Sequence, residues 1–291
     1  MIVILTALAV EQEAVLAHLA DVREHRHAQG TLFDVGTPAG HPGREVAVGV
    51  TGQGTLAAAT LTERAITEFS PAAVLFVGIA GGLRPWLEIG DVVVGTKVYA
   101  YHGGKSTDAD FLTRPRSWEI SHELEQVARK VHRTRKWYEP VGGAQAPEVH
   151  FEAIAAGDVV LDSGTSPVAN ALHRNYNDAV AVEMESAGFA LAGHLAGQVR
   201  TATVRGISDH ADGSKAVTDG RGGQRLAARN AAAFAVALAA AVHDGTNATR
   251  PSGAGKQFPI SIGNFTQKAG TVGQQNGVNT GDFHLNLGEK R

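Results

Sequence analysis

The sequence contains no cysteine, so disulfide bridges and thiolate metal sites are excluded. It also lacks an apolar run long enough to span a bilayer: the uncharged stretch 231–242 is too short and predicts a packed helix. The apolar N-terminal run has no basic segment before it and soon reaches Glu11 and Glu13. That pattern is typical of a first strand and not of a signal peptide, and we expect a cytoplasmic protein with no membrane partner.

There is no excess of positive charge either. The formal net charge is -3 and the pI about 6.5, which gives no reason to expect nucleic acid as a partner. A hydrophobic content of 43% and a mean hydropathy of -0.08 are ordinary for a globular chain. With 291 residues, the protein can form one large domain, or one domain with an appendage.

Short apolar, β-branched runs alternate with alanine-rich amphipathic segments. The pattern predicts strands at 2–7, 31–37, 44–52, 72–82, 90–101, 148–160, 178–183 and 199–208, and helices at 10–22, 55–69, 121–133, 186–196 and 222–242. Such alternation indicates an α/β domain whose sheet is covered on both faces. Ligands of these folds gather at the carboxyl ends of strands, and glycine-rich strand exits occur at 52–54 and 78–82.

The composition changes near Gly245. We expect one domain over residues 1–244 and a linker over 245–257. Residues 258–291 form a tail rich in Gly, Asn and Gln, without helical periodicity or enough apolar residues for a core of its own.

Carboxylates concentrate at the predicted strand exits. Glu183 and Glu185 follow one strand, Asp209 follows another, and Glu13 lies early in the first helix. We expect an acid-rich pocket with no lysine, no metal site and no cofactor. Carboxylates can hold sugar hydroxyls, protonate a leaving group or activate water, and glycosidic bond cleavage uses all three roles. Taken singly, each acid has a structural alternative: an ion pair of Glu185 with Arg205, a helix cap by Asp209, or a helix-dipole contact of Glu13.

Several motifs in order support the glycosidase interpretation. "AVEQEAV", "VTGQGTLAAA", "VGIAGGL", "IAAGDVVLDS", "AVEMES" and "VRGISDHAD" together resemble the purine nucleoside phosphorylase superfamily, and most of all its 5'-methylthioadenosine/S-adenosylhomocysteine nucleosidases. The resemblance covers about residues 1–243. It implies a single domain with a mixed central sheet flanked by helices, and a dimer or hexamer.

The resemblance also implies roles for individual residues. Asp209 would protonate purine N7, with Ser208 beside it, and Glu13 would position and activate water. Glu185 would hold the ribose hydroxyls, so that substrate and not protein satisfies its charge. Met184 would pack on the face of the sugar, and Val160 and Leu161 would hold the purine. The backbone at Gly81 would approach the substrate closely, and Glu183 would have a supporting role.

Two departures from the family pattern bear on the reaction. Phe76 stands where the phosphorolytic branch carries a phosphate-binding arginine, which favours water over phosphate as the nucleophile. Ile79 stands where relatives often have a polar residue, which leaves the exact substrate open. We therefore predict hydrolysis of a purine nucleoside or nucleotide, with adenine as the expected base. A phosphate-dependent phosphorylase and a non-catalytic nucleoside-binding assembly module are the alternatives.

The tail loosely resembles amyloid signalling motifs of immune effectors. Spaced apolar residues among Asn and Gln could stack in register as strands, with amide ladders along the fibre. The sequence thus predicts either self-assembly through residues 258–291, with a defence role for the enzyme, or a disordered tail.

Overall fold

The computed structural model describes residues 1–138, 146–197, 199–242, 272–273 and 287–288. The chain divides into two units, Met1–Asn247 and Ala248–Arg291. In the second unit the described residues form one antiparallel pair, β13 (Val272–Gly273) with β14 (Leu287–Gly288). The rest of the predicted linker and tail lies outside the described residues.

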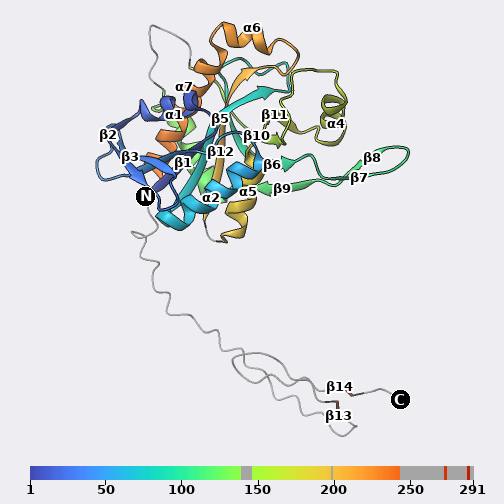
Figure 1. The fold of residues 1–291 in the computed structure, drawn as a ribbon, viewed down its shortest axis with the longest axis horizontal. Helices are drawn as coiled ribbons and strands as arrows, with labels where there is room; N and C mark the ends of the chain where they lie inside the picture. Colours follow the sequence, from blue (N-terminus) through green and yellow to red (C-terminus); the bar gives the residue numbers. More distant parts are fainter. Residues whose placement is uncertain (139–145, 198, 243–271, 274–286, 289–291) are drawn as a thin grey trace. The chain divides into compact units, whose positions relative to one another are not determined.

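A ten-stranded mixed sheet organises the first unit (Figure 1). Its strands are β1 (Ile2–Thr6), β2 (Leu19–Arg26), β3 (Leu32–Pro38), β4 (Val46–Val50), β5 (Ala73–Gly82), β6 (Val92–Ala100), β9 (Arg116–Glu119), β10 (Val149–Ala156), β11 (Ala179–Glu183) and β12 (Arg200–Asp209). The order is β11-β10-β6-β12-β5-β1-β4-β3-β2, and β9 pairs with β6. This confirms the predicted α/β fold with a mixed central sheet. A separate hairpin, β7 (Gly104–Ser106) with β8 (Phe111–Thr113), projects from the β6 and β9 end (Figure 1).

Helices cover both faces of this sheet. They are α1 (Ala9–Leu16), α2 (Thr55–Phe69), α3 (His122–Thr134), α4 (Pro167–Asn175), α5 (Ser186–Leu195), α6 (Lys215–Gly220) and α7 (Gly223–Ala241). In β1, Ile2 and Ile4 face the cluster around α7 and α3, whereas Val3 and Leu5 face the cluster shared with α2 and α5. Because side chains alternate across a strand, a strand covered on both faces must be apolar throughout.

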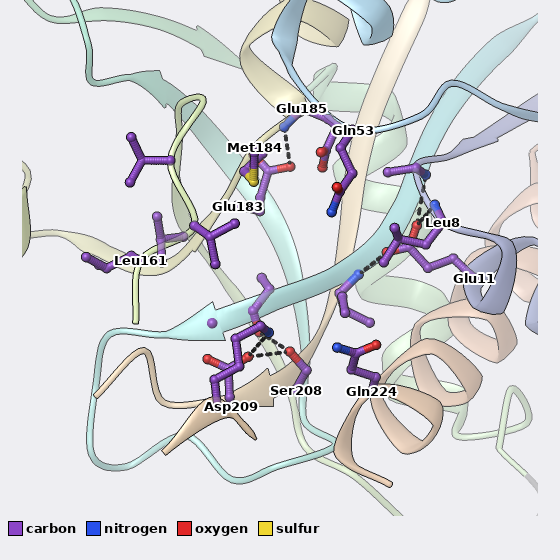
Figure 2. Close-up of a pocket in the computed structure, with 18 residues that line it drawn as sticks. Leu8, Glu11, Gln53, Leu161, Glu183, Met184, Glu185, Ser208, Asp209 and Gln224 are labelled. Carbon is purple, nitrogen blue, oxygen red and sulfur yellow. Dashed lines mark hydrogen bonds and ion pairs between the residues drawn. The ribbon is translucent and has the colours of Figure 1, made fainter. Parts of the chain in front are cut away.

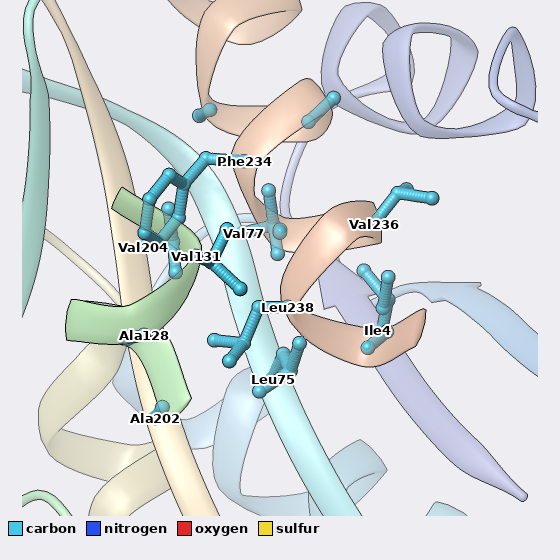
Figure 3. Packing of buried hydrophobic residues seen from close by; sticks show 14 of the residues in the cluster. Ile4, Leu75, Val77, Ala128, Val131, Ala202, Val204, Phe234, Val236 and Leu238 are labelled. Atoms are coloured by element: carbon cyan, nitrogen blue, oxygen red, sulfur yellow. The ribbon is translucent and has the colours of Figure 1, made fainter. Parts of the chain in front are cut away.

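The larger of these two clusters lies between the sheet and the long helix α7. Phe234 and Leu238 of α7 are fully buried there against Leu75 and Val77 of β5 and Val204 of β12 (Figure 3). Burying a side chain of this size stabilises the fold by about 1.5–3 kcal/mol. The cluster fixes β5 and β12 beside each other, and both strands end at the pocket described below.

Two predicted elements are wrong in extent: the strand expected at 148–160 ends at Ala156, and the first helix is shorter than expected. The helix expected at 10–22 ends at Leu16, and residues 19–26 form the edge strand β2. The residues of β2 are almost all exposed and pair only with β3, so they show no alternation of apolar and polar side chains. Pairing with β3, and not the local sequence pattern, determines the conformation of residues 19–26.

The sheet closes on itself where the candidate residues lie. β5 pairs in parallel with β12, with Gly81 opposite Asp209. The end of β5 also pairs with β11, through Gly81 with Val182 and Gly82 with Ala181. The two acid-bearing strand ends are therefore held on either side of the glycines that end β5.

Candidate active site

A pocket with a cavity volume of about 120 Å³ opens at the ends of β5, β11 and β12. Its lining comes from seven segments of the chain: Ala7, Leu8 and Glu11; Gln53; Ile79, Ala80 and Gly81; Val159, Val160 and Leu161; Val182, Glu183, Met184 and Glu185; Ser208 and Asp209; Lys215 and Gln224. Figure 2 shows these side chains around the cavity.

Arg205 of β12 is the fully buried cation behind this pocket. Its Nη2 pairs with Glu183 Oε2, lies 3.0 Å from Ser186 Oγ, and is 3.6 Å from Glu185 Oε2. Its guanidinium carbon lies 4.8 Å from the centre of the Phe76 ring. The face of the Phe76 ring therefore packs against this buried cation.

Glu183 is a structural acid in this arrangement. Its carboxylate accepts hydrogen bonds from the backbone N–H groups of Glu185 and Ser186 at 3.1 Å, at the N-terminus of α5. Burial raises the pKa of Glu183, and although Arg205 opposes this effect, the pKa is about 7. These contacts hold the "EMES" turn, so Glu183 shapes the site although it also borders the cavity.

Glu185 reaches the pocket from that turn. Its Oε1 accepts a hydrogen bond of 3.0 Å from the backbone N–H of Gly54, and its Oε2 faces Arg205. The expectation that substrate alone satisfies this charge is wrong: the ion pair with Arg205, considered as the structural alternative, is present. A carboxylate offers about four lone-pair sites, so acceptors remain for a ligand.

The acid that α1 brings into the cavity is Glu11. Its side chain is 2% exposed. Oε2 accepts hydrogen bonds from the N–H groups of Ala7 and Leu8 at 2.8 and 2.9 Å, and Oε1 accepts one from Ile79 at 2.8 Å. Burial raises the pKa of Glu11, opposed by Arg205 and by these amides. A buried carboxyl with a raised pKa is suited to accepting a proton.

Glu13, the predicted water-activating residue, lies elsewhere. It is exposed, and it borders a separate surface depression with Val10, Asp219 and Arg225. Residues two positions apart on a helix point in different directions, so only one of the two acids can enter the pocket. The structure thus places Glu11, and not Glu13, with the other acids.

Gly78 explains how Glu11 and Arg205 come together. A Cβ at this position would overlap Arg205 Nη1 and would lie 2.5 Å from Glu11 Oε1. No side chain fits between the two charged groups and strand β5. Glycine is therefore required at this position because Arg205 and Glu11 pack directly against the backbone of β5. The motif "VGIAGG" reflects this packing of charged groups against backbone.

Asp209 ends β12 with both oxygens hydrogen-bonded. Oδ1 accepts from the N–H of Ala211 at 2.9 Å, and Oδ2 lies 2.8 Å from Ser208 Oγ. A Cβ on Gly81 would sit 3.1 Å from Oδ1, so the glycine leaves room beside this carboxyl. Asp209, Ser208 and Gly81 are together in the pocket, as their predicted roles require.

The expectation of a pocket without lysine is wrong. Lys215, the first residue of α6, places its Nζ 2.8 Å from Asp209 Oδ2 and 3.9 Å from Asp219 Oδ2. Residues 215–220 show no clear helical periodicity, so the sequence does not predict that this lysine returns to Asp209. The pocket also has four lining residues that were not predicted from the sequence: Leu8, Gln53, Ile79 and Gln224.

The remaining predicted contacts line one side of the cavity. Leu161 is 7% exposed and Val160 is 57% exposed. Met184 lies between Glu183 and Glu185 and faces the same space (Figure 2). This apolar side is suited to a flat base. Among the described residues, no group of three or more His, Cys, Asp or Glu side chains could hold a metal ion, and no helix is long and apolar enough to cross a membrane.

The fold and the pocket define an α/β protein of the nucleoside phosphorylase type. The Phosphorylase superfamily profile matches residues 1–240. The chain belongs to this superfamily.

Relatives within it specify the enzyme class. The chain is 30% identical over 219 residues to the 5'-methylthioadenosine/S-adenosylhomocysteine nucleosidase of Shewanella sp. (strain W3-18-1), covering 72% of this chain and 86% of that protein. It is 28% identical over 215 residues to the enzyme of the same name from Actinobacillus succinogenes, covering 72% and 86%. These relatives confirm the predicted class, a hydrolase of N-glycosidic bonds.

Solved structures share the fold. The methylthioadenosine/S-adenosylhomocysteine nucleosidase of Neisseria meningitidis superposes with a TM-score of 0.69 at 24% identity, covering 83% of this chain and 99% of that one. A futalosine hydrolase of Helicobacter pylori gives 0.67 at 24% identity, with coverage of 81% and 96%. The mixed sheet and its helices are therefore those of known nucleosidases.

Proposed function

We propose that the protein hydrolyses the N-glycosidic bond of a purine nucleoside or nucleotide, with adenine as the expected base. One observation carries this proposal: Glu11, Glu185 and Asp209, from three separate elements, face a single cavity (Figure 2). Relatives named for adenine nucleosides support the choice of base.

The three acids fit three parts of the reaction. As the bond between the sugar carbon and the base nitrogen breaks, its electron pair moves into the purine. Asp209 supplies a proton to N7, which makes the base a neutral leaving group. Glu185 holds the ribose hydroxyls, and Met184 packs on the sugar. Water adds to the sugar carbon and gives its proton to Glu11, so the products are free base and free sugar.

Charge at the site favours water over phosphate. Four carboxyl groups, those of Glu11, Glu183, Glu185 and Asp209, surround a region whose cations are Arg205 and Lys215. Both cations already face carboxylates. An added phosphate would meet net negative charge at this site. These contacts support hydrolysis.

The experiment is a substrate panel. Methylthioadenosine, S-adenosylhomocysteine, adenosine, AMP and ATP are incubated with the full-length protein, and base release is followed by chromatography. We expect adenine from at least one compound. Nucleoside bound without base release from any of them would favour the non-catalytic alternative.

We further propose, from the sequence of residues 258–291, that the cytoplasmic enzyme forms homo-oligomers and that the tail drives higher assembly in a defence role. A peptide of residues 258–287 should form fibrils with a cross-β spacing of about 4.7 Å, and proline at Val278 should prevent them. A peptide that stays monomeric while the full-length protein polymerises would assign assembly to the catalytic domain.

A further inference from the structure

Lys215 is the charged residue of the pocket that the proposed chemistry leaves without a task. Its side chain is 26% exposed, so it sits at the cavity wall with access to the interior. Its Nζ lies 2.8 Å from the carboxyl oxygen of Asp209, the group assigned to N7 of the base. A cation this close to the acid assigned to N7 is placed to reach the same edge of the purine.

The ammonium has donors to spare. A lysine carries three N–H donors and no acceptor. Within the described part of the chain, one donor is used by Asp209, while Asp219 Oδ2 at 3.9 Å is beyond hydrogen-bond distance. The remaining donors can turn toward a ligand without breaking the contact to Asp209.

Purines differ at C6, whose substituent lies beside N7 on the same edge of the base. In adenine the 6-amino group is a donor, whereas hypoxanthine and guanine carry an oxo group, which accepts. An ammonium cannot accept a hydrogen bond from the amino group, but it pairs readily with O6 and N7. The 2.8 Å separation of the Asp209 oxygen and the Lys215 nitrogen lets the two groups contact neighbouring atoms of one base edge.

We propose that Lys215 is a specificity-determining residue that donates to O6 and extends the base site to 6-oxopurine nucleosides. The inference rests on the proposed function for the placement of the base against Asp209. Asp209 serves N7 of either base, and Lys215 adds a hydrogen bond that only the oxo base can receive. Adenine nucleosides use the site without this bond.

The test compares Lys215→Met with wild type on two matched pairs of ligands. Hydrolysis is measured as kcat/KM for adenosine and inosine, and binding as Kd for free adenine and hypoxanthine, which needs no catalysis. The control is Lys130→Met, which replaces an exposed lysine of α3 that does not line the pocket. Lys215→Arg keeps the charge and a donor, and should restore part of the preference.

We expect Lys215→Met to weaken hypoxanthine binding and inosine hydrolysis by about 10- to 100-fold, the range for a lost charge-assisted hydrogen bond. Adenine binding should change by less than about threefold, and adenosine hydrolysis should fall by less than inosine hydrolysis, because loss of the ammonium beside Asp209 affects protonation of N7 in both nucleosides alike. An equal loss for both bases would mean that the lysine only positions Asp209, and would overturn the proposal, as would wild-type protein that binds adenine but not hypoxanthine. Lysine-dependent binding of hypoxanthine without any hydrolysis would sustain this inference and refute the proposed function instead.

Discussion

Replacing Glu11 by glutamine removes the proton acceptor of the proposed reaction while keeping the shape of the side chain. The carboxylate receives three backbone N–H groups, two on Oε2 and one on Oε1. An amide has only one oxygen, so at least one of these donors loses its acceptor. Leaving a buried donor unpaired costs about 1–3 kcal/mol. The loss is offset in part, because glutamine removes an acid from a site where burial disfavours its charged form.

The effect on turnover should be larger than the effect on stability. General base catalysis contributes about 10²–10⁴-fold, so Glu11→Gln should lower kcat by that factor with a smaller change in KM. Glu13→Gln is the matched control: it lies two residues away on the same helix and is exposed, so stability should change by no more than about 0.5 kcal/mol. Adenine release and thermal unfolding are measured on both variants. Wild-type turnover in Glu11→Gln, or a comparable loss in Glu13→Gln, would refute the assignment.

Three other changes probe the same site. Asp209→Asn should lower kcat by about 10²–10⁴-fold with little effect on substrate affinity, because protonation of N7 matters in the transition state; unchanged steady-state rates would remove Asp209 from the mechanism. Gly78→Ala should destabilise the protein by about 1–3 kcal/mol and reduce activity, because its Cβ would overlap Arg205 and crowd Glu11; unfolding by denaturant measures the loss, and a fully active, equally stable variant would contradict the packing described. Because burial raises the pKa of Glu11 above the ordinary 4.5, the base becomes protonated as the pH falls through that raised value. The acid limb of kcat/KM should therefore lie above pH 4.5, and a profile flat down to that pH would exclude Glu11 as the base.

The sequence predicts the framework well because the framework depends on local pattern. Fully apolar, β-branched runs such as 73–77 are typical of strands covered on both faces, and β5 is one. Motif order then identifies which strand ends carry acids. Glu185, Asp209 and Ser208 reach the pocket because a strand end fixes the position of the residue that follows it.

The site residues that the sequence did not predict depend on exact helix boundaries and on contacts between residues far apart in the chain. Glu11 and Glu13 are both acids in the same short helix, and which one faces inward depends on where α1 begins and how it packs. Arg205 was considered only as an alternative partner of Glu185, yet it contacts Glu183 as well. Lys215 reaches Asp209 only through the short helix α6, whose six residues give no clear periodicity.

The most direct test of the central claim is the fate of the sugar. Adenosine, or the best substrate of the panel, is incubated with the protein in the presence and absence of inorganic phosphate, and the products are followed by phosphorus NMR and by a reducing-sugar assay. Hydrolysis predicts equal amounts of free base and free sugar, at a rate independent of phosphate. A sugar 1-phosphate, or a rate that rises in proportion to phosphate concentration, would contradict the account and identify a phosphorylase.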